Sequence, residues 1–522
     1  MAGCSADCCP DSAVPAWVVD DAVVTSCSAP HARSVDIAAA RPTAAAATLI
    51  VRREWLVVAP VGRVLRDMVH HRSEWDATGR TGCRCLAPVW GGRPRPAKML
   101  DVSSTGTDIA DPTYVVGTTL AGTRGRTGTI TTPHGPIRTP AFVPVGTKAT
   151  VKTVLPESVS ALGAQAVLAN AYHLYLQPGP EIIDAAGGLG AFMNWRGPTY
   201  TDSGGFQVMS LGAGFKKVIS MEATGTPDDD LTANGKERLS RVDDDGVTFK
   251  SHLDGSAHRF TPEVSMQIQH QLGADIIFAF DELTTLMNTR EYQVNSLERT
   301  RLWAIRCLDE HNRLSVERAH RPQQSLWGVI QGAQYEALRR KAARDLVALS
   351  EADRAVGGKG FGGYGIGGAL EKDNLGTIVG WVNDELPEDS PKHLLGISEP
   401  DDIFTAIENG VDTFDCVSPT RVARNGAIYS LDGRYNVTNA KYRSDFRPLD
   451  PEVENYTSQY SRAYLHHLFK AKEGLGATLA TLHNVSFIVT LVDRAREAIE
   501  NGTYTEYRDE FLRRYYGASR NS

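Results

Sequence analysis

The sequence lacks any apolar run close to the roughly 20 residues that a helix needs to cross a bilayer. Its N-terminus also lacks the charged region, apolar core and small-residue cleavage site of a secretory signal. Basic residues are not in excess, because 55 Lys and Arg face 62 Asp and Glu, which gives a formal net charge of −7. We therefore expect a soluble, cytoplasmic protein without membrane partners, in which any contact with nucleic acid is local.

The composition excludes a fibrous or wholly disordered chain, since 42% of the 522 residues are hydrophobic and 22% are charged. Residues 1–99 differ from the rest: they carry a net charge of +3 against −10, and they hold six of the eight cysteines. No cysteine pair there is followed by His or Cys at zinc-finger spacing. We expect residues 1–113 to form a poorly structured, low-complexity extension.

From residue 114 onward, short apolar runs alternate with longer helical patterns, which is typical of repeated β-α units around a parallel sheet. The predicted strands are Ala164–Asn170, Ala274–Asp281, Leu326–Gln331, His393–Gly396 and Val411–Asp415. The predicted helices are Pro156–Leu162, Pro262–Leu272, Thr289–Leu314, Tyr335–Leu349 and Pro400–Glu408. We predict an α/β fold in which residues 114–440 form a (β/α)8 TIM barrel and residues 441–522 form a mostly helical C-terminal appendix.

A doubly wound open sheet is the alternative architecture, yet no GxGxxG fingerprint follows an early strand. The stretch Gly357–Gly368 is rich in glycine but follows no convincing strand, so we do not expect it to be a phosphate cradle. In the appendix, Tyr460–Lys472 and Thr481–Asn501 have amphipathic helical patterns.

Three aspartates stand out, each with a structural alternative. Asp202 lies on a turn with two glycines that let a flat ligand approach, although it could equally be a helix N-cap. Asp281 ends a very apolar predicted strand, where a carboxylate is costly unless it has a partner or a task. Asp415 ends another strand and precedes Arg421 and Arg424, with which it could form an ion pair.

Two carboxylates at one barrel mouth indicate glycosidic-bond chemistry, in which one attacks the anomeric carbon and the other moves protons. The two arginines after Asp415 indicate that the sugar is attached to phosphate.

At these residues the chain closely resembles the bacterial tRNA-guanine transglycosylases. The resemblance extends from about Arg126 to the C-terminus and rests on ordered motifs rather than on any single one. These motifs are Thr127–Gly135, Pro144–Thr147, Asn170–Leu174, Asp202–Gln207, Phe280–Glu282, Gly328–Gly332, Ile366–Gly368 and Asp415–Gly426.

The resemblance implies that the enzyme exchanges the wobble guanine of tRNAs with GUN anticodons for 7-aminomethyl-7-deazaguanine during queuosine biosynthesis. It also implies a homodimer, and chemistry that needs no ATP, nicotinamide or catalytic metal. Asp415 matches the family's nucleophile and Asp202 its general acid/base. The matching substrate-binding residues are Asp202, Ser203, Gly204, Gly205, Phe206, Asp281, Gln331 and Gly368. The matching RNA-contacting residues are Gly396, Ile397, Ser398, Glu399, Pro400, Asp401, Asp402, Thr420, Arg421, Val422, Ala423 and Arg424.

Physical chemistry is consistent with these implied roles. Guanine presents N1–H and its exocyclic amine as parallel donors, which the carboxylate of Asp281 could accept together. The Gln331 amide and the Gly368 backbone N–H could donate to O6, and Phe206 could stack on the base. Adenine would leave Asp281 unpaired and would be rejected strongly.

The sequence departs from the family at the structural zinc. Relatives hold this zinc with a Cys-x-Cys-x-x-Cys motif and a later His, whereas here the three cysteine positions read Val453, Asn455 and Ser458, and only His483 remains. Valine cannot ligate, and neutral Asn and Ser are poor zinc ligands. We therefore expect no bound zinc, and a hydrophobic, hydrogen-bonded plug in its place.

Two other functions remain open from the sequence. One is a related transglycosylase that acts on another base or polymer, such as DNA. The other is a non-catalytic RNA-binding subunit, which the presence of both Asp202 and Asp415 argues against.

Overall fold

The computed structural model describes residues 112–213, 240–286, 288–368 and 372–517. The chain divides into two units, residues 1–99 and 100–522, and every described residue belongs to the second. The extension expected over residues 1–113 therefore lies outside the described residues, apart from its last two positions.

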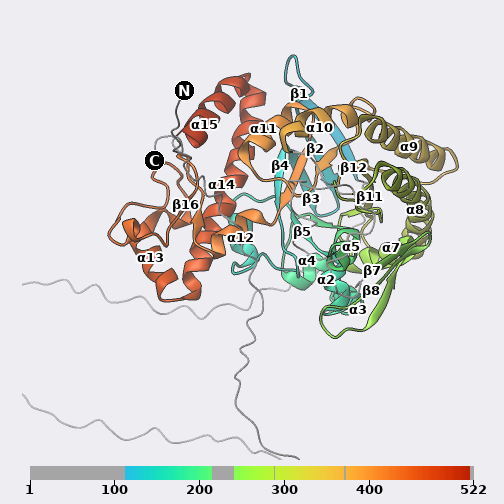
Figure 1. Cartoon of the computed structure of the whole chain (residues 1–522), viewed down its shortest axis with the longest axis horizontal. Helices are drawn as coiled ribbons and strands as arrows, with labels where there is room; N and C mark the ends of the chain where they lie inside the picture. The colour runs from blue at the N-terminus through green and yellow to red at the C-terminus, as the bar shows by residue number, and fades with distance from the viewer. Residues whose placement is uncertain (1–111, 214–239, 287, 369–371, 518–522) are drawn as a thin grey trace, which may run out of the picture. The chain divides into compact units, whose positions relative to one another are not determined.

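Eight parallel strands form the central barrel (Figure 1). They are β4 (Ala141–Pro144), β5 (Val167–Ala169), β6 (Thr199–Thr201), β10 (Ile276–Phe278), β11 (Ser325–Ile330), β12 (Gly363–Ile366), β13 (Lys392–Leu394) and β14 (Thr413–Cys416). Each strand pairs with the next one along the chain, and β14 pairs back onto β4, with Phe414 opposite Phe142. A parallel bridge between Val145 and Leu168 links β4 to β5 and completes the ring. The predicted (β/α)8 fold is confirmed.

Helices connect and cover these strands. They are α1 (Pro156–Ala161), α2 (Ala171–Leu176), α3 (Pro180–Ala185), α4 (Leu189–Met193), α5 (Gly205–Ala213), α7 (Pro262–Leu272), α8 (Arg290–Glu317), α9 (Glu336–Ala355), α10 (Leu375–Asn383), α11 (Pro400–Glu408) and α12 (Ser418–Arg424). Local signals set several starts: the Thr261 hydroxyl accepts from the N–H of Val264 at the start of α7, and Thr289 caps α8 in the same way. The helices predicted at Pro262 and Pro400 have the predicted bounds, and both open on a proline in the first turn.

Strand β12 lies within the glycine-rich stretch 357–368 and was not among the strands predicted from the sequence. Its glycines are a packing requirement, because a Cβ on Gly363 would lie 2.6 Å from the indole ring of Trp327 on β11. Trp327 is fully buried inside the barrel. A large side chain on one strand thus selects the smallest residue on its neighbour, and this removes the β-branched pattern by which strands are recognised.

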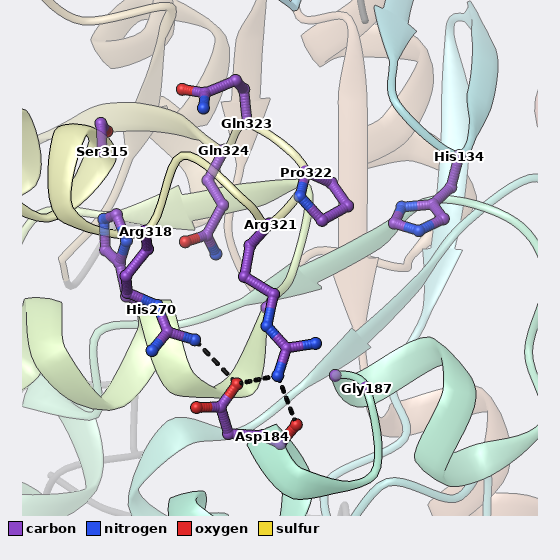
Figure 2. Close-up of a pocket in the computed structure, with 12 residues that line it drawn as sticks. His134, Asp184, Gly187, His270, Ser315, Arg318, Arg321, Pro322, Gln323 and Gln324 are labelled. Atoms are coloured by element: carbon purple, nitrogen blue, oxygen red, sulfur yellow. Dashed lines mark hydrogen bonds and ion pairs between the residues drawn. The ribbon is translucent and has the colours of Figure 1, made fainter. Parts of the chain in front are cut away.

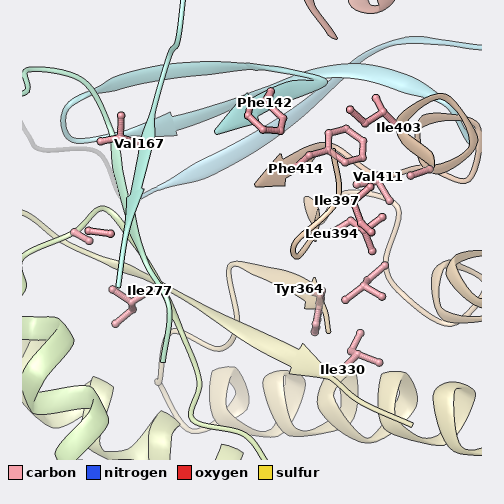
Figure 3. Packing of buried hydrophobic residues seen from close by; sticks show 14 of the residues in the cluster. Phe142, Val167, Ile277, Ile330, Tyr364, Leu394, Ile397, Ile403, Val411 and Phe414 are labelled. Atoms are coloured by element: carbon pink, nitrogen blue, oxygen red, sulfur yellow. The ribbon is translucent and has the colours of Figure 1, made fainter. Parts of the chain in front are cut away.

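The barrel separates two apolar cores, because successive strand residues point to opposite faces. On β10, Ile276 and Phe278 point inward and pack with Tyr200 and Trp327. Ile277 points outward into the larger core beneath the helices. Figure 3 shows this outer layer, in which Phe142, Leu394 and Phe414 project from neighbouring strands.

Three small antiparallel sheets accompany the barrel. Strands β1 (Thr113–Thr119), β2 (Arg126–Thr132) and β3 (Gly135–Thr139) precede it. Strands β7 (Ser240–Asp243), β8 (Gly246–Lys250) and β9 (Ala257–Phe260) lie between β6 and β10 in the chain. A short pair, β15 (Ala427–Ile428) and β16 (Tyr435–Asn436), follows α12.

The C-terminal region is helical, with α13 (Arg462–Lys470), α14 (Gly474–Asn501) and α15 (Tyr504–Gly517). Its apolar core also includes Ile428 and Val437, which precede the expected boundary at residue 441. The central helix α14 packs against α12, α13, α15 and the first barrel strand β4. The buried Arg496 of α14 donates to the carbonyl oxygens of Arg138 and Pro140, just before β4.

We expected no segment that could cross a membrane, and helix α14 is an exception to this expectation. By length and mean hydropathy it is the one described helix that could do so. However, 78% of its apolar window is buried inside the protein, as in the core helix of a packed domain. Its apolar character is accounted for by its contacts with the barrel and with the other C-terminal helices.

Candidate active site

The residues singled out in the sequence collect where the barrel strands end. Asn170 follows β5, Asp202 follows β6 and Asp281 follows β10. Gln331 follows β11, Gly368 follows β12 and Gly396 follows β13. Asp415 is the next-to-last residue of β14. The carboxyl ends of parallel barrel strands meet at one mouth, which is where barrel enzymes build their active sites. The barrel topology thus brings the three aspartates to the same end of the molecule.

Asp202 is held by the segment that follows β5. One carboxylate oxygen accepts a 2.8 Å hydrogen bond from the N–H of Ala171, and the other accepts from the side-chain amide of Asn170. Burial raises the pKa of Asp202 to about 7, and the negative charge of Asp415 adds to this rise while the Ala171 hydrogen bond opposes it. The carboxyl group can therefore both give and take a proton near neutral pH.

Asp281 is buried, with 7% of its surface exposed. Its Oδ2 accepts a 2.6 Å hydrogen bond from the Gln331 amide, and its Oδ1 accepts one of 3.2 Å from the Ser203 hydroxyl. Burial raises the pKa of Asp281 to about 6, against the lowering effect of these two hydrogen bonds. The structure therefore places Asp281, Gln331 and Ser203 in one hydrogen-bonded group.

Asp415 is held on one side only. Its Oδ1 lies 3.1 Å from Nε2 of His393 and 3.1 Å from the N–H of Gly396. Its Oδ2 accepts no hydrogen bond from the described residues. The sequence reasoning did not identify His393 as a site residue, although a polar residue at the start of an apolar predicted strand was a usable signal.

Glycines and one aromatic residue shape the space around these carboxylates. A Cβ on Gly205 would lie 2.8 Å from the carbonyl oxygen of Asp281, so the start of α5 lies directly against this residue. Gly368 has a φ of 87°, and a Cβ there would lie 2.4 Å from the Gln331 side-chain oxygen. Phe206, in the first turn of α5, leaves 39% of its surface exposed, so its ring is accessible for stacking.

The predicted RNA-contacting segments are only partly accessible. Six of their residues are buried: Ile397, Ser398, Pro400, Thr420, Val422 and Ala423. Two acidic side chains point to neighbours within the chain, because Glu399 pairs with Arg434 and Asp401 accepts a hydrogen bond from Tyr516. Among these twelve residues, Gly396 and Arg421 are exposed, and Glu399, Asp401, Asp402 and Arg424 are half-buried.

Two exposed lysines near the mouth were missed by the sequence reasoning. Lys148 and Lys152 belong to the loop after β4. They lie close enough to His173 to act on it: burial, His252 and these two lysines together lower its pKa to about 4. Their signal in the sequence was weak, since two lysines in a loop are common. They add positive charge beside a mouth that holds three carboxylates.

A small cavity of about 30 Å³ lies at the opposite end of the barrel, beside the starts of β10 and β11. Figure 2 shows Arg318 and Arg321 both directed at Asp184, which each contacts at 2.7 Å. His134 lies on the other side and pairs with Asp275 at 2.7 Å. The cavity has room for only one or two water molecules, so it is not a site for a nucleobase.

The positions of the family's zinc ligands are occupied by a hydrogen-bonded turn. Asn455 and Ser458 cap a short 3-10 helix, Tyr456–Gln459, and the side chain of each accepts a hydrogen bond from the backbone of the other. Val453 is buried. His483 is fully buried, with Nε2 2.8 Å from the Tyr429 carbonyl oxygen and Nδ1 3.2 Å from the Thr457 hydroxyl. No group of three His, Cys, Asp or Glu side chains in the described part of the chain could hold a metal. These residues do not fit a zinc ion.

Comparison with known proteins agrees with the geometry. The sequence profile of the family described as Queuine tRNA-ribosyltransferase matches residues 121–517. The chain is 44% identical over 395 residues to the Queuine tRNA-ribosyltransferase of Desulforamulus reducens, which covers 75% of this chain and 95% of the relative. The Queuine tRNA-ribosyltransferase of Halothermothrix orenii is 43% identical over 397 residues, which cover 75% of this chain and 95% of the relative. That of Fusobacterium nucleatum is 41% identical over 395 residues, which cover 76% of this chain and 96% of the relative. The chain therefore belongs to the queuine tRNA-ribosyltransferase family of pentosyl-transferring enzymes.

Proposed function

We propose that this enzyme exchanges the wobble guanine of tRNAs with GUN anticodons for 7-aminomethyl-7-deazaguanine, on the route to queuosine. The observation that supports it best is the pair of carboxylates at the barrel mouth. One oxygen of Asp415 accepts no hydrogen bond from the described residues, and Asp202 has a pKa of about 7 that the charge of Asp415 helps to raise. Such a pair suits a nucleophile and a proton carrier that work on one glycosidic bond.

In the first half of the reaction, Oδ2 of Asp415 attacks C1′ of the wobble ribose. The bond between C1′ and N9 of guanine breaks, its electron pair moves onto the base, and Asp202 gives its proton to the departing base. The ribose is then attached to Asp415 through an ester, with the configuration at C1′ inverted. Asp202 is left as a carboxylate.

In the second half, the deazaguanine enters the vacated pocket and Asp202 removes a proton from it. The deprotonated base attacks C1′ and the ester bond to Asp415 breaks, so that the carboxylate is restored. Two inversions return the original configuration of the ribose. The protons balance, since the one given to guanine is replaced by the one taken from the incoming base.

Base selection falls to the group around Asp281. Its carboxylate would accept from guanine N1–H and the exocyclic amine, taking over from the hydrogen bonds that Ser203 and Gln331 now donate. The Gln331 amide and the N–H of Gly368 would then donate to O6. The exposed ring of Phe206 would stack on the base, a contact worth about 1–3 kcal/mol.

For tRNA binding we propose contacts from Arg421 and the half-buried Arg424, with Lys148 and Lys152 as further phosphate ligands. The buried residues of the two predicted segments would shape these loops instead of touching RNA. A cytoplasmic location follows from the substrate, since tRNA is modified there.

We also propose that two copies of the chain associate through the C-terminal region. Tyr456 and Tyr464 are exposed, and the rings of Tyr460 and Tyr464 stack with centroids 5.9 Å apart. Exposed aromatic groups of this kind are enriched at protein interfaces. Replacing Tyr464 by lysine should shift the sedimenting species toward the monomer.

The appendix would fold without zinc, because its residues fill the metal position with hydrogen bonds of their own. No step of the proposed reaction involves a metal.

An exchange assay tests the proposed function. Purified protein is incubated with labelled guanine and one of three nucleic acids: a GUN-anticodon tRNA, the same tRNA with adenine at the wobble position, or DNA. Label should enter the first at the wobble position only. Label in DNA or elsewhere in tRNA would favour a related transglycosylase, and no label at all would favour a non-catalytic RNA-binding subunit.

A further inference from the structure

His393 occupies an unusual place for a histidine. It lies on β13 with its side chain fully buried inside the barrel, between the rings of Tyr200 and Phe278 at centroid distances of 5.6 and 5.4 Å. A polar ring in such a setting is costly unless its nitrogens are hydrogen-bonded. Both nitrogens of His393 have partners, and one of them is the proposed nucleophile.

The partners determine which way the hydrogen bonds run. Nε2 is 3.1 Å from Oδ1 of Asp415, and Nδ1 is 2.9 Å from the hydroxyl of Thr413, which lies opposite His393 on the next strand. An ionised carboxylate can only accept, so Nε2 carries the hydrogen. The Thr413 hydroxyl can either donate or accept, so Nδ1 is satisfied whether the ring is neutral or charged. The donor to Asp415 is therefore fixed in direction.

A second donor acts on the same oxygen. The N–H of Gly396, just past the end of β13, is 3.1 Å from Oδ1 of Asp415. Two donors on one oxygen fix the rotation of the carboxylate about its Cβ–Cγ bond. The other oxygen, Oδ2, receives no hydrogen bond from the described residues and keeps its lone pairs available.

We propose that His393 is a positioning residue for the base-exchange reaction: it holds Oδ1 of Asp415 so that Oδ2 faces C1′ of the ribose. This role rests on the proposed function, because it requires Asp415 to be the nucleophile. The effect belongs to the chemical step, since His393 is buried beneath the mouth and does not reach the tRNA. Loss of the donor should slow the attack on C1′ and leave tRNA affinity nearly unchanged.

Two substitutions separate the hydrogen bond from the packing. His393→Phe keeps a ring between Tyr200 and Phe278 but cannot donate. His393→Gln loses the ring but places an amide donor close to the position of Nε2. The measurement is the single-turnover rate at which enzyme and GUN-anticodon tRNA form a denaturation-resistant complex, together with the Kd for the tRNA.

We expect His393→Phe to slow complex formation about 10- to 100-fold, the range for losing one hydrogen bond to a charged group, with tRNA affinity within about threefold of wild type. His393→Gln should recover the rate to within about tenfold of wild type. His311→Phe is the matched control, because His311 is also buried and hydrogen-bonded, but to His270 and outside the barrel. It should lower stability without changing the rate.

Thr413→Val provides a second variant in case His393→Phe does not fold. It keeps the shape of a fully buried side chain and removes the partner of Nδ1, so it should slow complex formation several-fold through a less ordered imidazole. A wild-type rate in Thr413→Val would then overturn the proposal.

The remaining outcomes are also decisive. A wild-type rate in His393→Phe, or equal losses of rate in the Phe and Gln variants, would overturn the positioning role. The proposed function would still hold in that case, provided that the wild-type protein is active. A wild-type protein that forms no complex and exchanges no guanine would overturn the proposed function and this role together.

Discussion

Replacing Thr457 by valine tests whether the appendix is held together without zinc. Thr457 is fully buried, and valine has nearly the same shape, so the change removes a hydroxyl and little else. That hydroxyl lies between Nδ1 of His483, at 3.2 Å, and the side-chain oxygen of Asn455, at 2.6 Å. The hydroxyl therefore links Asn455 and His483, two of the positions that hold the zinc in the family.

The cost of the substitution follows from counting hydrogens. Burial lowers the pKa of His483. Its Nε2 lies 2.8 Å from the Tyr429 carbonyl oxygen, which can only accept, so Nε2 carries a hydrogen. The Thr457 hydroxyl donates its single hydrogen to the Asn455 side-chain oxygen, and its own oxygen is the partner of Nδ1 of His483. Valine removes both contacts, although the Asn455 oxygen still accepts from the N–H of Thr457. One buried ring nitrogen left without a partner should lower the free energy of unfolding by about 1–3 kcal/mol.

Thermal and urea unfolding of wild type, Thr457→Val and the control Thr457→Ser, each with and without a chelator, measure this effect. Thr457→Val should unfold a few degrees below wild type, Thr457→Ser should stay close to it, and the chelator should change neither. A wild type that loses stability on chelation, or that retains one tightly bound zinc per chain, would refute the reasoning. A Thr457→Val variant as stable as wild type would refute the assigned role of the hydroxyl.

Further expectations concern the reaction and the extension. Asp415→Asn should form no denaturation-resistant complex with tRNA, because an amide is a far weaker nucleophile; gel analysis after denaturation would show it, and wild-type yield would contradict the role. Asp281→Ala should reduce guanine incorporation much more than it weakens tRNA binding, and equal losses in the two assays would argue against base reading. Because burial raises the pKa of Asp202 to about 7, its acid form is lost as the pH rises through that value. The single-turnover rate of guanine release should therefore fall above about pH 7 and lose this dependence in Asp202→Asn. Deletion of residues 1–98, which precede the matched region 121–517, should leave exchange within a few-fold of wild type, and loss of folding would contradict this.

The sequence predicted those parts of the fold that depend on local signals. Helices that open on a proline after a capping residue, such as Pro262–Leu272, have the predicted bounds because proline and cap act over a single turn. Strand β12 was missed because Trp327 on another strand leaves no room for a side chain at Gly363, and no local pattern reveals this contact. Strand β6 was missed because its three residues, two threonines around a tyrosine, form no apolar run.

For the candidate site too, the sequence predicted what depends on local signals and not what depends on contacts between distant residues. Asp281 and Asp415 could be singled out because a carboxylate at the end of an apolar strand is expensive without a task. The sequence could not show that Asp281 bonds to Gln331, 50 residues away, or that His393 contacts Asp415. Nor could it show that half of the predicted RNA-contacting residues are buried, because burial depends on packing between elements far apart in the sequence, such as α12 against α14.

The contacts of α14 with β4 have a consequence for how the chain folds during synthesis. The first barrel strand pairs with the last, more than 250 residues later in the sequence, and the buried Arg496 then bonds to the carbonyl oxygens just before that first strand. Until β14 has been synthesised, β4 keeps an unpaired edge, and until α14 has been synthesised, the apolar surface that this helix covers has no partner. A nascent chain stalled before residue 413 would therefore expose both surfaces, and would be a natural client of chaperones that shield hydrophobic segments.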